Sequence, residues 1–486
     1  MNKNISRLKL KINKKYKEIL EAYFPTGTKR RYFLALLKKG FYTIYREGLR
    51  GFLRKAKKKI IIKKKVSKEA LDAVDLPSSI ELFFVPNILP IKVSVIILTK
   101  NAGNEFDYIL KKITNQKGIS KIEIIIVDST SDDATLEIAK RYTDKWFIIK
   151  SEDFHNSRTR NFAADKSSGD YLIFMLQDAI PGSNDLFYNM LFPMVTKDIH
   201  ALTVKKVPRI DADLFSSWLI WQEYNYLDYS RDYIRNNKLF VDFSSLDLKD
   251  KVKYSFLDDV CLAINKEIFE RHKFNYTYCE DLELGKRLII NGHNLMFVNS
   301  HAVVYSHNND ALYFLKRGCV NSYFIKEIFD CKMGERDFLE ISNTIKVLIR
   351  YFVFALNTYY DIKSFDNDVI FYHYKYLNNL LNVGVELGNF NSNPFLKEKS
   401  QKILGFFSKL EPVQGISSSR YDIGVVNRLL NTYQDILDDF KQYCDILGYK
   451  KVDEDFLDSL FKLFCFSIGG YLGEELVNVD YFRGDL

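Results

Sequence analysis

Short apolar runs alternate with amphipathic stretches between residues 92 and 176 of this 486-residue chain. The apolar runs have the length and composition of strands and lie at 92–98, 122–127, 146–150 and 171–176. The stretches between them have the helical period and lie at 105–116, 133–142 and 157–166. Strands that alternate with helices at this spacing predict a parallel sheet covered by helices, an α/β fold.

The chain is longer than one hydrophobic core usually supports, so two or three domains are expected. A Pro-containing break at 75–90 precedes the α/β pattern, and the strand signal fades near residue 321, where aromatic-rich helical segments take over. We therefore predict a basic, mostly helical segment at 1–88, an α/β domain at 89–320 and an all-helical domain at 321–486.

The cysteines and the hydropathy pattern indicate a cytoplasmic protein. The six cysteines form no CxxC pair and no metal-ligand spacing, and no secretory leader precedes them, so reduced thiols are expected. No window offers the roughly 18 uncharged apolar residues that a membrane-spanning helix needs.

Basic residues are concentrated at the start of the chain. Residues 1–65 hold 22 Lys and Arg against three Glu, and apolar residues between Phe33 and Leu53 recur at helical spacing. This pattern is typical of a basic amphipathic helix on an anionic membrane, where each Lys or Arg contributes about 1 kcal/mol. A helix docked on the body with a solvated charged face is the alternative. Nucleic acid ranks lowest, because no nucleic-acid-binding signature accompanies the charge. We expect a peripheral protein at the inner face of the cell membrane.

Polar side chains follow three of the predicted strands at the point where each strand ends. They are Thr99 and Asn101, Asp128 and Ser129, and Gln177 and Asp178. Parallel strands bring these ends to one edge of the sheet, where open α/β sheets bind ligands. Arg160 and Asn161 open the preceding helix, where N–H groups and guanidinium groups can face phosphate, although solvated arginines at a helix start are the alternative. The arrangement suggests a site for a metal-bound diphosphate.

Two further features complete the candidate site. Glu280 and Asp281 precede an amphipathic helix, and His307 follows the apolar stretch LMFVNSHAVV. Together they would supply one acid for a metal, one for proton transfer, and an imidazole. Two acids that merely cap the helix are the alternative.

Six strings occur in an order that resembles a known family. They are VSVIILTKNAGNEFDYILKKITNQ, IIIVDSTSDDATLEIAKRY, FHNSRTRN, FMLQDAIP, EDLELGKRL and YSHNND. The chain resembles the inverting family 2 glycosyltransferases of GT-A fold across roughly residues 90–325. Within the family it is most similar to bacterial rhamnosyltransferase-like enzymes that build O-antigen, capsule or other surface polysaccharide.

The resemblance implies a role for each candidate residue. Asp128 would face the nucleotide base or ribose, and Asp178 would be the acid of a DxD motif that is reduced here to Gln177, Asp178 and Ala179. One carboxylate with diphosphate oxygens and water can still hold Mg²⁺ or Mn²⁺. Asp281 would be the general base, supported by Glu280.

Two more roles follow from matched motifs. His307 would lie near the diphosphate or metal, although Tyr305 stands where relatives commonly carry another histidine. The TRN match favours Arg160 and Asn161 over Arg158 for a contact with the donor.

The implied reaction is inverting transfer of a sugar from a nucleotide-diphosphate donor to a growing glycan or lipid-linked acceptor. Rhamnose is one candidate sugar. Two alternatives stay open: a transferase that uses a UDP-hexose or UDP-N-acetylhexosamine, and a non-catalytic scaffold in a polysaccharide assembly complex.

Overall fold

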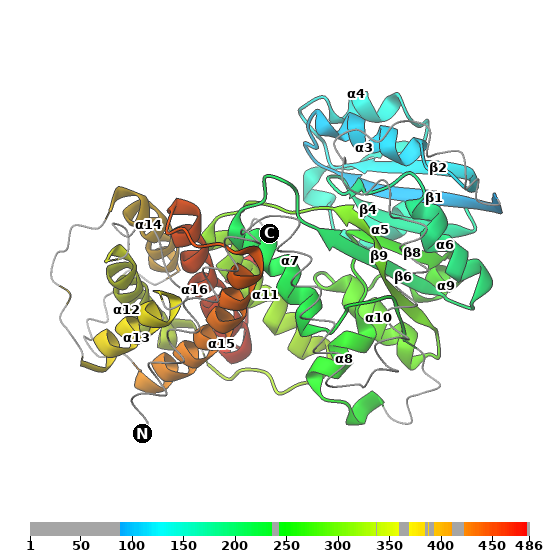
Figure 1. The fold of residues 1–486 in the computed structure, drawn as a ribbon. Coiled ribbons are helices and arrows are strands. Elements are labelled where there is room, and N and C mark those ends of the chain that lie inside the picture. The colour runs from blue at the N-terminus through cyan, green and yellow to red at the C-terminus, as the bar shows by residue number, and fades with distance from the viewer. Residues whose placement is uncertain are drawn as a thin grey trace, which may run out of the picture. The chain divides into compact units, whose positions relative to one another are not determined.

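Figure 1 shows the computed structural model, which describes residues 88–235, 243–336, 338–358, 369–383, 387, 393–410 and 422–483. The basic segment at 1–65 and nearly all of the expected N-terminal segment at 1–88 lie outside the described residues. The amphipathic helix on an anionic membrane therefore stays a prediction.

The first four strands run parallel, as the alternating pattern predicts. Their order is β3-β2-β1-β4, and they span Leu89–Thr99 (β1), Ile119–Asp128 (β2), Trp146–Ile148 (β3) and Tyr171–Leu176 (β4). Thr99 pairs in register with Asp128, and Leu98 pairs with Leu176. The ends of the three central strands therefore lie side by side.

The second half of the sheet adds antiparallel strands to the parallel half that the alternating pattern predicts. Its strands are β5 (Ile180–Pro181), β6 (Ala201–Val207), β7 (Tyr233–Arg235), β8 (Cys261–Asn265) and β9 (Leu295–Val304). Strand β8 is antiparallel to both β4 and β6, whereas β6 and β9 are parallel. The chain enters β8 at the edge where β4 and β6 end, so β8 must run in the opposite direction.

Helices cover both faces of the sheet. In β1, Val93, Val95 and Ile97 pack against α3 (Glu105–Thr114), α4 (Thr135–Lys140) and α6 (Leu186–Thr196). Ile96 points to the other face, which is covered by α5 (Asn156–Asp165), α9 (Lys266–His272) and α10 (Glu280–Ile290). Because strand residues alternate between faces, an apolar run such as β1 needs a helical layer on each side.

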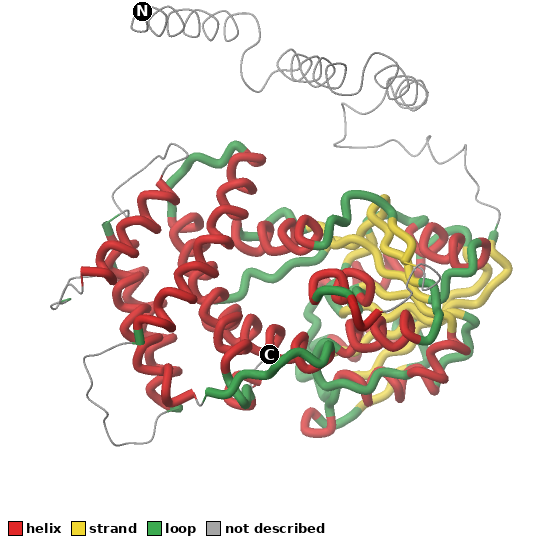
Figure 2. The backbone as a smooth tube through the Cα atoms, turned by 90° about the horizontal axis from the view of Figure 1, so that it is seen from below, coloured by secondary structure: helices red, strands yellow, loops and turns green. Residues whose placement is uncertain are grey.

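A helical region follows β9, as predicted. It comprises α11 (Ala311–Ile328), α12 (Phe338–Asn357), α13 (Val369–Val383), α14 (Pro394–Lys409), α15 (Ile423–Leu447), α16 (Glu454–Glu475) and α17 (Asp480–Arg483). Figure 2 shows these helices beside the strands. Helix α7 (Leu214–Tyr226) belongs to the earlier part of the chain, but its Phe215 and Trp218 join the same hydrophobic cluster.

Helix α16 is the one helix among the described residues that is long and apolar enough to cross a membrane. Within the protein, 83% of its apolar window is buried. Its N-terminal part is tied to the start of α7, because the Lys462 ammonium lies 2.7 Å from Asp213 and Asp455 accepts a hydrogen bond from the Leu214 N–H. Helix α16 thus packs as an interior helix of the helical region.

Helices α11 and α16 approach each other closely at glycines. A Cβ atom on Gly469 would lie 2.1 Å from the Leu315 carbonyl oxygen, and one on Gly473 would lie 2.1 Å from that of Cys319. We expect Gly469→Ala to lower the free energy of unfolding by about 1–3 kcal/mol, because the helices must separate.

Denaturant unfolding measures this effect. Gly405→Ala on α14 is the matched control, since no atom lies within 4 Å of its added Cβ and alanine favours a helix by about 0.5–1 kcal/mol. Equal effects of the two substitutions would contradict the close helix contact.

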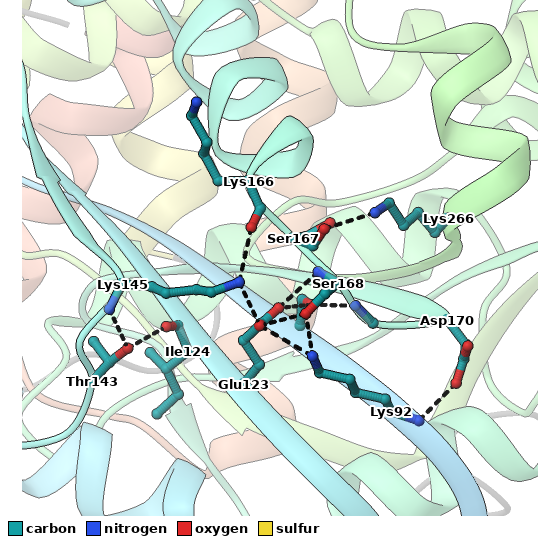
Figure 3. Close-up of polar contacts among 12 residues, drawn as sticks. Lys92, Glu123, Ile124, Thr143, Lys145, Lys166, Ser167, Ser168, Asp170 and Lys266 are labelled. Atoms are coloured by element: carbon teal, nitrogen blue, oxygen red, sulfur yellow. Dashed lines mark hydrogen bonds and ion pairs between the residues drawn. The ribbon is translucent and has the colours of Figure 1, made fainter.

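A polar cluster joins the sheet at the edge opposite the candidate site (Figure 3). The Glu123 carboxylate accepts hydrogen bonds from the Ser94 hydroxyl at 2.5 Å and the Ser168 N–H at 2.9 Å, and it lies 2.7 Å from the Lys145 ammonium. Burial would raise the pKa of Glu123, but the hydrogen bonds from Lys145, Ser168 and Ser94 lower it far below its usual value of 4.5. The ionised carboxylate therefore links β1, β2 and the turn before β4.

We expect Glu123→Gln to cost about 1–3 kcal/mol of unfolding free energy at pH 7. Because the folded-state pKa of Glu123 is lowered, its contribution is complete above pH 4.5 and declines as the pH falls below that value. The difference between wild type and variant should shrink between pH 5 and pH 3 in denaturant titrations. Glu152→Gln, at an exposed ion pair with Lys150, is the control and should change little at either pH.

Candidate active site

The loops after β1 and β2 are built around Asp128. Its carboxylate accepts hydrogen bonds from the Thr99 hydroxyl at 2.8 Å and from the Ser131 N–H and hydroxyl at 2.8 and 2.6 Å. The side chains of Thr99 and Asp128 are both buried. In this arrangement Asp128 shapes the loop, and its contact with a nucleotide stays a prediction.

The other strand-end residues lie at the same edge. The Asn101 N–H donates to the Ser131 hydroxyl at 2.8 Å, and the Ser129 hydroxyl donates to the Thr99 carbonyl at 3.1 Å. The Gln177 carboxamide exchanges two hydrogen bonds with the backbone of Lys100. The sequence-predicted residues after β1, β2 and β4 are therefore brought together.

Asp178 and His307 meet although they are far apart in the sequence. Asp178 follows β4 and His307 follows β9, and the Nε2 atom of His307 lies 2.6 Å from Oδ2 of Asp178. Both side chains are partly exposed, and the Tyr305 ring packs edge-on against the imidazole. A carboxylate and an imidazole that converge at an open sheet edge are suitable ligands for a divalent ion such as Mn²⁺.

The Arg160 side chain is buried and contacts two carboxylates, so it does not face an open phosphate site. One guanidinium nitrogen lies 2.7 Å from Glu280 and another 2.5 Å from Asp259, and the Arg160 side chain is 7% exposed. The Asn161 carboxamide donates to the Phe274 carbonyl at 2.8 Å and accepts from its N–H at 3.0 Å. These contacts differ from the predicted donor contacts, because α5 turns both side chains toward the loop before α10.

Glu280 and Asp281 occupy the first turn of α10, immediately after Cys279 in a left-handed conformation. The Asp281 carboxylate accepts a hydrogen bond from the Asp259 N–H at 3.1 Å. Burial raises the pKa of Asp281 well above its usual range, and the charges of Asp259 and Glu280 raise it further. Burial also raises the pKa of Glu280 to about 7, although Arg160 opposes the rise. Such perturbed carboxyl pairs are common in active sites.

Asp258, Asp259 and Asp281 form an acidic group, with one carboxylate oxygen from each lying within 4.8 Å of the others. Asp258 is paired with the Lys206 ammonium at 2.8 Å, and Asp259 is paired with Arg160. Since these cations already offset two of the three charges, Asp178 and His307 are the more available metal ligands.

Three candidate site residues were not identified from the sequence. Asp258 and Asp259 precede β8, and the string LDDV before an apolar run was a signal for them. Arg317 on α11 was not predictable, because its place near the acids depends on tertiary packing. Its guanidinium makes no hydrogen bond or ion pair with any described residue, and its positive charge opposes the rise in the pKa of Glu280.

A protein-family model described as Glycosyl transferase family 2 matches residues 94–272. The chain is similar to the O-antigen chain rhamnosyltransferase WbaN of Salmonella anatum, with 26% identity across 44% of this chain and 66% of that protein. It is also similar to the O-antigen chain rhamnosyltransferase RfbN of Salmonella typhimurium, with 27% identity across 45% of this chain and 67% of that protein. The chain thus spans about two thirds of the length of these relatives.

Among solved structures, the chain is similar to the mannosyltransferase PcManGT from Pyrobaculum calidifontis in complex with GDP-Man and Mn²⁺. The identity is 13%, the TM-score is 0.40, and the match covers 75% of this chain and 90% of that chain.

Proposed function

Because residues 94–272 match the model of Glycosyl transferase family 2, we propose that this protein transfers a sugar from a nucleotide-diphosphate donor to a growing glycan. The domain confirms the family resemblance predicted from the sequence. We propose rhamnose as the sugar and a lipid-linked surface polysaccharide precursor as the acceptor, because two relatives are named O-antigen chain rhamnosyltransferases.

One observation carries the proposal. The contacting pair of Asp178 and His307 and the perturbed carboxyl pair of Glu280 and Asp281 lie at the same edge of the sheet. Sugar transfer from a nucleoside diphosphate needs both functions, since the leaving diphosphate carries negative charge and the acceptor hydroxyl must lose a proton.

The donor would bind across the ends of β1, β2 and β4. Asp178 and His307 would hold Mg²⁺ or Mn²⁺, which when bound would offset charge on the leaving diphosphate. The Arg209 guanidinium donates a hydrogen bond to Glu105, which is the largest cause of its raised pKa, and the nearby Asp178 carboxylate raises that pKa further. Arg209 and Arg317, whose guanidinium has no ion-pair partner among the described residues, would thus take over the phosphate role that the sequence predicted for Arg160.

The acceptor would bind on the side of α10. Asp281 would remove the proton from the acceptor hydroxyl as that oxygen attacks the anomeric carbon, and the bond to the diphosphate would break on the opposite face. Configuration inverts and no covalent enzyme intermediate forms. The paired Arg160 and the backbone of Asp259 would hold Glu280 and Asp281 in position.

A donor screen tests the proposal. The full chain is incubated with dTDP-rhamnose, UDP-glucose, UDP-N-acetylglucosamine or GDP-mannose, with and without Mn²⁺, and release of the nucleoside diphosphate is measured. We expect hydrolysis of dTDP-rhamnose that depends on Mn²⁺. If only a UDP-sugar is hydrolysed, the protein is still a transferase but its donor is not dTDP-rhamnose. If no donor is hydrolysed and no nucleotide binds, the proposal is overturned.

Asp178→Asn should weaken Mn²⁺-dependent nucleotide binding at least tenfold in isothermal titration, because the neutral amide is a poor ligand for a hard cation. Binding without Mn²⁺ should change much less. Asp438→Asn, at an exposed carboxylate of α15, is the control. Equal Mn²⁺ dependence in wild type and Asp178→Asn would remove Asp178 from the metal site.

A further inference from the structure

A pocket of about 400 Å³ lies outside the site described above. It is formed by the end of β6, one side of α7 and Tyr443 of α15. Figure 1 shows these elements, with α7 leading from the sheet toward the helical region. The pocket is therefore shared by the α/β part and the helical region.

Aromatic rings form one wall of the pocket. Trp221 of α7 and Tyr443 of α15 lie with their ring centroids 5.4 Å apart at an angle of 38°. Tyr229 also lines the pocket and stacks on Phe297, which fixes its ring. Flat, rigid aromatic surfaces at little conformational cost suit the apolar C–H faces of sugar rings.

Polar side chains line much of the remainder of the pocket. Among the described residues, the Lys205 ammonium and the Asn225 carboxamide make no hydrogen bond or ion pair, and both line the pocket. The neighbouring Lys206 differs, since its ammonium is paired with Glu223 and Asp258 at 2.8 Å each. The carboxamide nitrogen of Asn299 donates to the Ser230 carbonyl at 3.0 Å, which leaves its oxygen free to accept. Free donors and acceptors around an aromatic wall match the hydroxyl groups of a saccharide.

The pocket adjoins the acceptor side of the candidate active site. Lys206 lines the pocket and its ammonium contacts Asp258, a member of the acidic group that contains Asp281. The Val207 carbonyl accepts from the Tyr305 N–H at 2.9 Å, two residues before His307. These two contacts connect the lining of the pocket to the acidic group and to the segment before His307.

We propose that this pocket binds a saccharide unit of the acceptor glycan behind the unit that reacts. The proposal rests on the proposed function, because it takes the acceptor to be an oligosaccharide. It gives the helical region a role in substrate binding through Tyr443.

Binding of the full-length protein to a printed array of several hundred defined glycans tests the proposal. We expect wild type to bind a subset of glycans and Trp221→Ala to lose at least tenfold in affinity. Since Trp221→Ala removes packing, Asn225→Ala at an exposed position provides a second variant, with an expected loss of three- to tenfold. Tyr226→Ala, an exposed aromatic of the same helix that does not line the pocket, is the matched control and should bind as wild type does.

Nucleotide-sugar hydrolysis, measured without acceptor, separates this proposal from the proposed function. Variants that lose glycan binding but keep hydrolysis support both. If the pocket variants lose glycan binding but wild type hydrolyses no donor, the result supports saccharide binding in the pocket and not the proposed transferase function. Absence of glycan binding by wild type, or equal binding by wild type and both pocket variants, overturns the pocket.

Discussion

Replacing Asp281 with asparagine is expected to lower sugar transfer about 10²- to 10⁴-fold, the usual contribution of a general base. Asparagine keeps the shape and can still accept the hydrogen bond from the Asp259 N–H. Donor binding should therefore be unchanged. Transfer rates and nucleotide titrations, measured on the same preparation, check both expectations.

The same substitution should raise thermal stability. The folded-state pKa of Asp281 is raised, so its ionisation opposes folding as the pH rises above its usual value of 3.8. A neutral amide removes that cost, and the thermal midpoint of Asp281→Asn at pH 7.5 should exceed that of wild type. Loss of activity together with a gain in stability is typical of a functional carboxyl. Glu267→Gln, at an exposed ion pair of α9, should change neither property, and unchanged transfer by a folded Asp281→Asn would rule out Asp281 as the base.

Replacing Arg160 with methionine is expected to cost about 3–5 kcal/mol of unfolding free energy at pH 7.5. The substitution leaves Glu280, whose side chain is 7% exposed, and Asp259 without their shared cation. An uncompensated buried carboxylate is costly, so Glu280 should become protonated in the folded state. Arg158→Met, at an exposed position of the same helix, is the matched control.

The pH dependence gives the Arg160 prediction a second readout. Burial already raises the pKa of Glu280 to about 7, and loss of the opposing Arg160 charge raises it further. A carboxyl with a raised folded-state pKa contributes its full stability below its unfolded value of 4.5 and loses it as the pH rises toward the folded value. The deficit of Arg160→Met should therefore be largest near pH 8 and shrink toward pH 5 in denaturant titrations. A deficit that does not change with pH would contradict the buried ion-pair assignment.

The sequence predicted the positions of the strand-end residues well, because chain direction alone decides them. Thr99, Asp128 and Asp178 end parallel strands, and parallel ends must meet at one edge. The motif order then brought in Glu280, Asp281 and His307, and the structure places His307 against Asp178.

The directions in which side chains point at the candidate site could not be predicted from the sequence. Arg160 and Asn161 open a helix, as predicted, but periodicity does not tell which face of α5 meets the loop before α10. Arg317 lies in the region predicted to be helical core, and only the packing of α11 brings it near Asp281. Asp258 and Asp259 were missed because they precede an antiparallel strand, whose beginning rather than end lies at the site.

Helix α11 spans the predicted domain boundary at residues 320 and 321 without a break. It carries Arg317 near the acids, and at Leu315 and Cys319 it presents the carbonyl oxygens that the glycines of α16 approach. Among the described residues, α11 therefore links the helical region directly to the acidic group at the sheet edge. A partner that shifts α16 would move α11, and with it the Arg317 guanidinium relative to Asp281. A chain that ends at residue 320 would lack Tyr443 and the helix α16 that α11 contacts.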